Sequence, residues 1–295
     1  MGLAKAALQF IAREHRRKPF SDSVLTLGRQ GVLATLEDVR QMLISERITP
    51  AALSSSEDTR TNIPDWIGTP YEVNTSDVVF FRLLGLTDIK ALDYSEYENA
   101  EIIHDLNLPV PNELRDRFDL IVDAGTTEHV FDVRQSLTNI AHMLKPGGRV
   151  IHISPANNYT NHGFYQFSPT LYFDYYSANA FVDLRGFIAE QDTYLYDVRP
   201  WDVFEATAAT GRLTSARSLM IIFVAEKTVR STADVIPVQT FYQQIYQPSI
   251  SQRFSVTAVL KHLLPYKVKV FLARNLPFLD PLRKPWGLKR WGRLG

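Results

Sequence analysis

Between residues 118 and 154 the hydrophobic positions change from a strand pattern to a helical pattern and back. An apolar run at 120–122 ends at Asp123 and a glycine turn, which predicts a short strand. Apolar side chains then recur at helical spacing on one face, at Val133, Leu137, Ile140 and Leu144. Pro146-Gly147-Gly148 ends this helix, and the apolar run at 150–153 predicts a second strand. Strand, helix and strand joined by tight turns predict a parallel sheet.

The rest of the chain is assigned from similar patterns. Asp132 is placed to cap the helix just described, with Gln135 in capping-box register. A second possible cap is Thr75, before a helix at 76–84. The other predicted elements are helices at 1–20 and 35–46 and strands at 23–27, 89–92, 101–104, 187–198 and 218–226.

These elements group into three parts. Residues 1–20 form an N-terminal helix, and residues 21–230 form the main domain. Inside the main domain a segment at about 35–75, polar and proline-containing over most of its length, is interpreted as an insertion after the first strand. Residues 231–295 form a C-terminal appendage of short helices and proline-broken turns.

Composition narrows the class of protein. The 295 residues carry a net charge of zero, 45% of them are hydrophobic, and there is no cysteine. Disulfides and thiolate metal sites are therefore excluded. No apolar run has the length of a membrane span, and the N-terminus has the charge pattern of an amphipathic helix, so we expect a cytoplasmic protein. Positive charge gathers at 261–293, away from the predicted sheet, which argues against a nucleic-acid enzyme.

Candidate chemistry follows from the parallel sheet. Ligands of such sheets bind beyond the carboxyl ends of the strands. Two segments occupy that position in the predicted unit, residues 123–129 and the residues from Ser154 onward. We therefore expect the active site there.

The motifs in this region resemble a known family. The pieces FDLIVDAG, EHV and LKPGG stand in the order found in the fourth and fifth strands of class I S-adenosylmethionine-dependent methyltransferases. DYSEYENAEIIHDLN, EHVFDV and NHGFYQFSP are similar to bacterial methyltransferases of surface-glycan pathways. The general resemblance covers roughly residues 20–230. It implies an α/β fold: a Rossmann-like, doubly wound, seven-stranded mixed sheet with helices on both faces and two antiparallel edge strands, carrying the inserted segment and a C-terminal helical appendage.

The resemblance also implies the cofactor S-adenosylmethionine. Its ribose diol needs a carboxylate that accepts two hydrogen bonds, its adenine amino group needs an acceptor, and its methionine tail needs close backbone approach. The expected contacts are Asp93 and Tyr94 for the ribose, Asp105 and Leu106 for the adenine, Gly28 for the methionine, and Asp123, Ala124 and Gly125 on the other side. Aspartates at strand ends are also common turn formers, which is the alternative for each of them.

The first strand turn departs from the family pattern, in which an acid precedes three alternating glycines. Thr26 stands at the acid position and Gln30 at the middle glycine. A side chain at Gln30 limits how closely the backbone approaches a ligand. Arg29 is expected either to pair with the cofactor carboxylate or to be a surface residue.

Methyl transfer to a hydroxyl needs alignment and a group that manages the proton of the acceptor. The candidates are His162, His129, Glu128 and Tyr165. Glu128 and His129 also fit the simple beginning of a helix, where an acid is favoured. Relatives with Glu-His at this place that bind a divalent metal use an additional upstream glutamate. Gly125 stands at that position here, so no metal is expected.

The expected function is O-methylation of a sugar, glycan or glycolipid. Two alternatives stay open, a methyltransferase of small-molecule specialised metabolism and a non-catalytic binding protein that retains the fold. The segment 261–294 mixes basic residues with Trp and Leu, which suits peripheral contact with an anionic membrane at its inner face. Its alternative is an arm that packs on its own domain or in a homodimer.

Overall fold

The computed structural model describes residues 2–54, 74–191, 200–207, 215–246 and 290–294. Its centre is a mixed sheet of nine strands in the order β12-β10-β9-β11-β8-β7-β2-β5-β6. The five strands from β8 to β6 run parallel, and the other four pair antiparallel. The strands are β2 (Ser23–Leu27), β5 (Asp88–Asp93), β6 (Ile102–Ile103), β7 (Phe118–Ala124), β8 (Leu144–Asn157), β9 (Val182–Gln191), β10 (Trp201–Ala206), β11 (Ser218–Glu226) and β12 (Arg290–Leu294).

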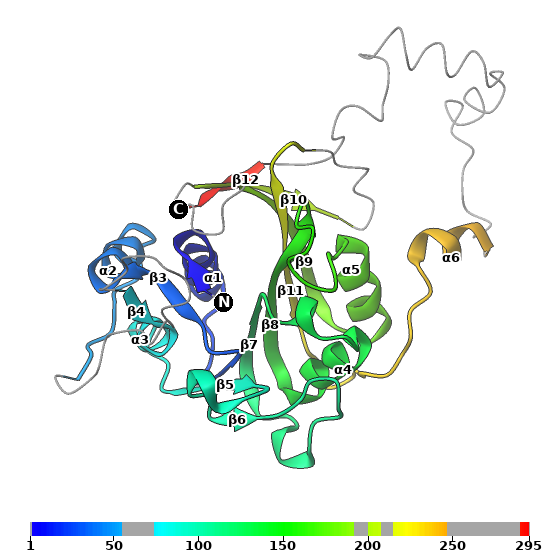
Figure 1. Cartoon of the computed structure of the whole chain (residues 1–295), viewed down its shortest axis with the longest axis horizontal. Coiled ribbons are helices and arrows are strands. Elements are labelled where there is room, and N and C mark those ends of the chain that lie inside the picture. Colours follow the sequence, from blue (N-terminus) through cyan, green and yellow to red (C-terminus); the bar gives the residue numbers. More distant parts are fainter. Residues whose placement is uncertain (1, 55–73, 192–199, 208–214, 247–289, 295) are drawn as a thin grey trace, which may run out of the picture.

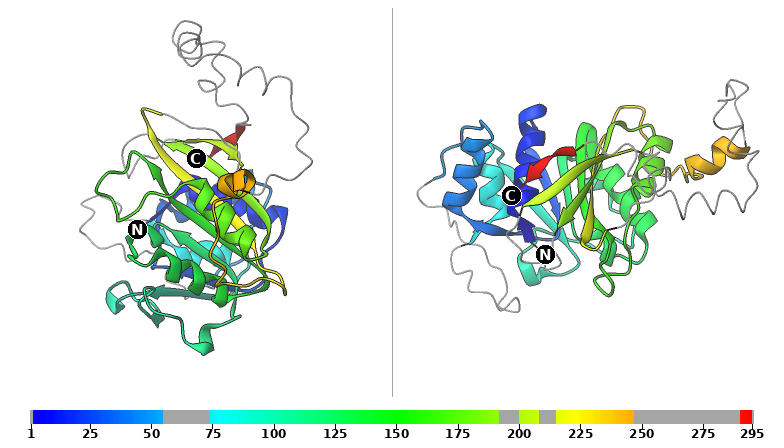
Figure 2. Two further views of the ribbon diagram at one scale, coloured as in Figure 1. Left: turned by 90° about the vertical axis from the view of Figure 1, so that its right-hand side faces the viewer. Right: turned by 90° about the horizontal axis from the view of Figure 1, so that it is seen from above.

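Helices cover both faces of this sheet (Figure 1; Figure 2 gives two further views). On one face lie α1 (Lys5–Arg17), α2 (Leu36–Ser45) and α3 (Asp77–Leu83), and on the other lie α4 (Val133–Met143) and α5 (Pro169–Ala178). Neighbouring strand residues divide between two hydrophobic clusters, since Val24 packs in one and Leu25 in the other. Strand side chains point alternately to the two faces, so both faces of the sheet carry a core. The doubly wound α/β fold class is confirmed.

The sheet has two strands more than the seven expected. β10 forms a hairpin-like addition between β9 and β11 in the chain, and β12 adds an antiparallel edge strand at residues 290–294. Trp291 of β12 packs against Phe10 and Phe187, with ring centroids 5.3 and 5.2 Å apart. The end of the predicted appendage is therefore a strand of the main sheet, and this tryptophan is not available as a membrane anchor.

A second, small sheet combines the N-terminal strand with two strands from the residues between β2 and α3. β1 (Gly2–Ala4), β3 (Gly31–Thr35) and β4 (Asn74–Ser76) form it in the order β1-β3-β4. The crossover from β2 to its parallel neighbour β5 is completed by α3, which begins only at Asp77. Residues 55–73 of the predicted insertion lie outside the described part.

Helix caps decide where α3 and α4 begin. Asp132 caps α4 as predicted, because its Oδ1 accepts a hydrogen bond from the backbone N–H of Gln135 at 2.9 Å. The predicted reciprocal bond of the capping box is absent from α4, since the Gln135 side chain donates to Asn139 instead. Ser76, and not Thr75, caps α3 through a bond from Val79 N. The cap is thus one residue later than predicted, at the last residue of β4.

The remaining described elements are short. They are the helix α6 (Thr240–Tyr246) and the 3₁₀ turns η2 (Glu96–Glu98), η3 (Asn112–Leu114) and η4 (Thr127–His129). Within the described ranges every helix is too short or too polar to cross a lipid bilayer. Most of the basic segment at 261–294, on which the membrane prediction rests, lies outside the described residues.

Candidate active site

The carboxyl ends of β2, β5 and β7 meet at Gly28. Its N–H donates to the carbonyl of Leu92 at the end of β5, at 2.7 Å. The hydroxyl of Thr126, beyond β7, donates to the carbonyl of Leu27 at 2.6 Å. Gly28 has φ +71°, and a Cβ there would lie 3.3 Å from Thr126 Oγ1 and 3.6 Å from Asp93 Oδ2. The left-handed backbone and the narrow space both favour glycine, which leaves the backbone open to close approach by a ligand.

Asp93 lies at this junction, and one of its two carboxylate oxygens accepts hydrogen bonds from the backbone. Its Oδ1 accepts hydrogen bonds from the backbone N–H groups of Tyr94 at 2.6 Å and Ser95 at 3.4 Å. The other oxygen, Oδ2, faces Gly28. Tyr94 follows at the surface with its ring exposed. The structure therefore brings Gly28 and Asp93 together although they are far apart in the sequence.

The side chain of Gln30 is buried beside the same turn. Its Nε2 donates to the Leu27 carbonyl at 2.9 Å, while its Oε1 is buried with no hydrogen-bond partner. The backbone N–H of Gln30 donates to Asp77 Oδ2 at 3.1 Å. Asp77 also accepts a bond from the hydroxyl of Thr26 at 3.4 Å. Thr26 stands where the family pattern has an acidic residue. In the folded protein, Asp77 at the start of α3 places a carboxylate beside this position.

Asp77 is a site residue that sequence reasoning missed, because it looked like an ordinary acid in the first turn of a helix. It is fully buried, and this burial raises the pKa of its carboxyl group, with the Arg29 guanidinium acting against the shift. Arg29 lies 3.4 Å from Asp77 and 2.6 Å from Glu101, to which it donates through Nη2. In this structure the guanidinium is engaged by two carboxylates, and pairing with a cofactor carboxylate would require it to leave one of them.

The loop after β6 carries the expected adenine contacts. Asp105 Oδ1 accepts bonds from the backbone N–H and the amide of Asn107, and these bonds lower the pKa of Asp105. Leu106 is buried. Buried Asn139 of α4 holds this loop, since it donates to the Leu106 carbonyl at 3.1 Å and accepts from Val110 N at 3.0 Å. Asn139 was not predicted, since its position within a helix gave no signal.

Asp123 shapes the turn after β7 from inside the protein. Its carboxylate is fully buried and lies 2.7 Å from Nδ1 of His152, whose Nε2 lies 2.7 Å from the Tyr176 hydroxyl. Its other oxygen accepts the N–H of Thr127 at 3.1 Å. The Asp123 side chain therefore fixes the turn from inside the protein, and its contact with the cofactor stays a prediction. Ala124 and Gly125, the latter with φ +84°, form the turn itself.

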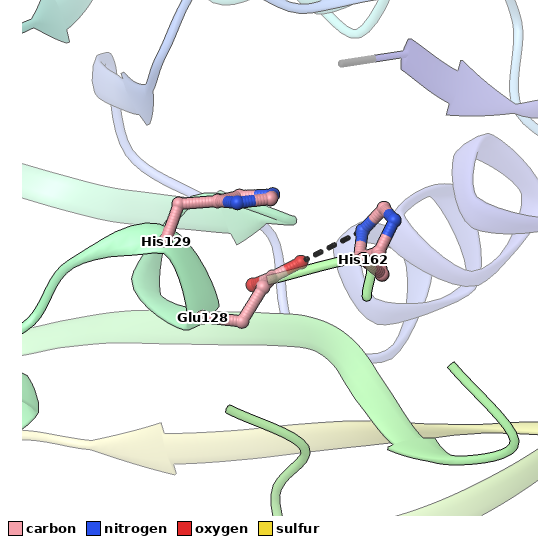
Figure 3. A group of neighbouring side chains, drawn as sticks. All are labelled: Glu128, His129 and His162. Carbon is pink, nitrogen blue, oxygen red and sulfur yellow. Dashed lines mark ion pairs between the residues drawn. The ribbon is translucent and has the colours of Figure 1, made fainter. Parts of the chain in front are cut away.

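Three of the predicted catalytic side chains form a cluster beside this turn (Figure 3). Glu128 and His129 come from η4, and His162 comes from the loop after β8. Glu128 Oε1 lies 3.6 Å from His162 Nε2, and the rings of His129 and His162 have centroids 5.2 Å apart. Burial raises the pKa of Glu128 and lowers that of His129, which His162 lowers further. In both groups burial favours the uncharged form.

The two loops that supply the cluster are joined through their backbones. The carbonyl oxygen of Glu128 accepts hydrogen bonds from Phe164 N at 2.9 Å and Tyr165 N at 3.2 Å. A Cβ on Gly163 would lie 2.9 Å from this oxygen and 3.2 Å from His129 Nδ1. The hydroxyl of Tyr165, the fourth predicted catalytic group, donates to the Phe131 carbonyl at 2.9 Å, outside the cluster.

Gly163→Ala is therefore expected to push the His162 loop away from Glu128. Overpacking of this kind costs about 1–3 kcal/mol of unfolding free energy, and displacement of a reacting group by about 1 Å reduces turnover by about 10²-fold. Thermal denaturation and turnover measure the two effects. Thr160→Ala, an exposed position in the same loop, is the matched control. Equal behaviour of the two variants would contradict the tight contact at Gly163.

Comparison with known proteins gives a family match for part of the chain. Residues 87–152, from the start of β5 to the middle of β8, match the family model described as "Methyltransferase domain". No curated protein matches the chain.

The solved structures that align with this chain share little sequence with it. The methyltransferase domain of the citrinin polyketide synthase aligns with 75% of this chain at 8% identity and a TM-score of 0.38, and this chain covers 52% of that one. A possible histamine N-methyltransferase from Thermotoga maritima aligns with 75% of this chain at 14% identity and a TM-score of 0.37, covering 89% of its own length. A SAM-dependent methyltransferase from Archaeoglobus fulgidus aligns with 75% at 10% identity and a TM-score of 0.37, covering 94% of its own length.

The fold class rests on the strand order, in which a parallel half and an antiparallel half meet at β8 and β11. The matched residues include β5, β7 and most of the loops that carry Asp93, Asp105 and Glu128. The strand order and the family match together support a methyltransferase domain that uses S-adenosylmethionine.

Proposed function

We propose that this chain transfers a methyl group from S-adenosylmethionine to a hydroxyl of a sugar, glycan or glycolipid. The observation that carries the proposal is the Glu128–His129–His162 cluster, which lies directly after the turn that joins β7 to the cofactor strands. When bound, S-adenosylmethionine supplies an electrophilic methyl group. The acceptor side must then align an oxygen and deal with its proton.

The residues at the strand ends fit this cofactor. Gly28 leaves room for close backbone approach, and Asp93 Oδ2 faces the same space, where it suits a ribose diol. The buried, unpartnered Oε1 of Gln30 is an acceptor of the kind that the ammonium of a methionine tail needs. Gln30, which the sequence places among the expected cofactor residues despite its departure from the glycine pattern, would thus supply an acceptor in this proposal.

The cluster offers groups that could accept the proton of an acceptor hydroxyl. An alcohol reacts poorly without a group that takes or weakens its proton, and imidazole and carboxylate groups supply that function. Thr126, which bonds to β2, stands only two residues before Glu128, so the cluster adjoins the cofactor edge. His129 is exposed and His162 is partly exposed, so an acceptor can reach both rings.

Two exposed aromatic rings support a sugar-like acceptor. Phe131 and Phe164 follow the two histidines in sequence and form an edge-to-face pair with centroids 5.6 Å apart. Their exposed fractions are 70% and 65%, which is high for phenylalanine. Exposed rings beside polar catalytic groups provide the apolar surface on which a sugar ring packs.

Calorimetry with S-adenosylhomocysteine tests the cofactor half of the proposal. Asp93→Ala is expected to weaken binding by about 1.5–3 kcal/mol, the contribution of hydrogen bonds to a charged group. Asp88→Ala, at the opposite end of the same strand, is the control and should bind as the wild type does. Absence of binding to the folded wild-type protein would favour the non-catalytic alternative.

A screen of acceptors tests the other half. Purified protein and labelled S-adenosylmethionine are incubated with monosaccharides, glycolipids, small phenols and amines, and methyl transfer is measured. Transfer to sugar hydroxyls supports the proposal, and transfer only to small phenols or amines would replace it with the small-molecule alternative. Phe131→Ala and Phe164→Ala should raise the KM for a sugar acceptor while cofactor affinity stays unchanged.

A further inference from the structure

We infer that Glu128, His129 and His162 form a binding site for a divalent transition-metal ion. One ligand atom from each residue can be chosen so that all of them lie within 4.8 Å of one another. One carboxylate and two imidazoles on one side of an ion leave its other positions open, an arrangement found in catalytic metal sites. Sequence reasoning expected no metal because Gly125 cannot supply a ligand, and it did not foresee that His162 would complete the set from another loop.

The state of Glu128 is the second, independent observation. Its side chain is fully buried, and neither of its carboxylate oxygens has a hydrogen-bond partner. A buried carboxylate with no donor is costly unless a charge compensates it. Its oxygen Oε1 points to His162 across 3.6 Å, which is too long for a hydrogen bond (Figure 3). A cation placed between these groups would satisfy the carboxylate.

The backbone of the site is already fixed, so only side chains need to adjust. Phe164 N and Tyr165 N bind the Glu128 carbonyl, and His129 N binds the Thr126 carbonyl at 2.9 Å. Zinc–ligand distances of about 2.0–2.2 Å require the three ligand atoms to approach one another by roughly 1 Å. His129 is exposed, so its ring can turn to bring a nitrogen closer to the other two ligand atoms.

The donor set also predicts which ions bind. Imidazole favours zinc, iron, nickel and copper, whereas magnesium and calcium prefer sites made of oxygen ligands. We therefore expect Zn²⁺ and Co²⁺ to bind and Mg²⁺ not to compete. If the proposed function is correct, the open positions of the ion would receive the acceptor hydroxyl and lower its pKa, so that its proton passes to water. This role rests on the proposed function, but binding of the ion does not.

The test uses full-length protein without a histidine tag, treated with a chelator and titrated with Co²⁺ and Zn²⁺. We expect one ion to bind per chain, with visible cobalt absorption and little change in excess Mg²⁺. Glu128→Gln, His129→Ala and His162→Ala should each weaken binding by at least the roughly 10–100-fold that loss of supporting groups around a metal costs. His142→Ala, on α4 beside Arg115, is the histidine control and should bind normally.

S-adenosylhomocysteine binding, measured on the same samples, separates the two proposals. Variants that lose cobalt but keep S-adenosylhomocysteine affinity are folded and support the metal site. Absence of saturable cobalt binding in the wild type, or unchanged affinity in His162→Ala, would overturn the metal site and leave the methyltransferase proposal intact. Cobalt binding without any binding of S-adenosylhomocysteine would overturn the proposed function instead.

Discussion

Replacing His162 by alanine is expected to reduce turnover by about 10²–10⁴-fold, the range typical of a lost acid–base group. The imidazole lies 3.6 Å from the buried Glu128 carboxylate, on a loop that the backbone of Glu128 holds in place. Whether it accepts the proton itself or ligates an ion, its loss removes the group that makes the acceptor hydroxyl reactive. Affinity for S-adenosylhomocysteine should change little, since the residues proposed to bind the cofactor come from the ends of β2 and β5 and the loop after β6.

The measurement is single-turnover transfer to the acceptor found in the screen, together with calorimetry of S-adenosylhomocysteine. Glu128→Gln should likewise lose turnover and keep its affinity for S-adenosylhomocysteine. His142→Ala, remote from the cluster, should keep wild-type turnover. Full turnover in both His162→Ala and Glu128→Gln would show that the cluster takes no part in transfer and that positioning alone drives the reaction.

The strands and helices of the main sheet could be predicted because burial leaves a clear periodic pattern. The predicted bounds of β2 and β11 agree with the structure at 23–27 and 218–226. β12 could not be predicted in the same way. Its five residues, RWGRL, show no strand pattern. They pair with β10, and Trp291 packs against Phe10 and Phe187, which are distant in the sequence.

The site was predictable where its residues follow strands directly. Gly28 and Asp93 are brought together because adjacent parallel strands end at one edge. Asp77 was missed because the inserted residues separate it from Gln30, its partner in space. Asp123 was expected at the cofactor, yet His152 on the neighbouring strand draws its carboxylate inward. Side-chain direction at a strand end depends on such partners, which the periodic pattern does not encode.

The ion pairs of α1 raise the question of whether the N-terminal helix is a separate unit. Glu14 of α1 is 2% exposed and binds Arg185 of β9 at 2.5 Å through its Oε1. Arg149 of β8, also 2% exposed, places Nη1 3.7 Å from the same carboxylate and stacks over Phe20 at 4.2 Å. Burial lowers the pKa of Arg149 to about 10, and Glu14 opposes this shift. The single carboxylate of Glu14 thus faces the positive charges of two arginines, which come from two strands of the sheet.

Glu14→Ala is therefore expected to destabilise the whole domain by about 3–5 kcal/mol, because the buried Arg149 charge loses its carboxylate and keeps only backbone carbonyls as partners. Arg185 is 23% exposed and can turn to water, so Arg149 carries most of the loss. Replacing both buried charges, as Glu14→Leu with Arg149→Met, should cost less than Glu14→Ala alone, since no charge stays behind.

Chemical denaturation measures these free energies, with Glu37→Ala on the exposed face of α2 as a control expected within about 0.5 kcal/mol of wild type. A single cooperative transition shifted to lower denaturant would show that α1 folds with the sheet, so that removing it would unfold the main domain. If Glu14→Ala cost no more than Glu37→Ala, α1 would be an appendage, and the division at residue 20 would describe the energetics correctly.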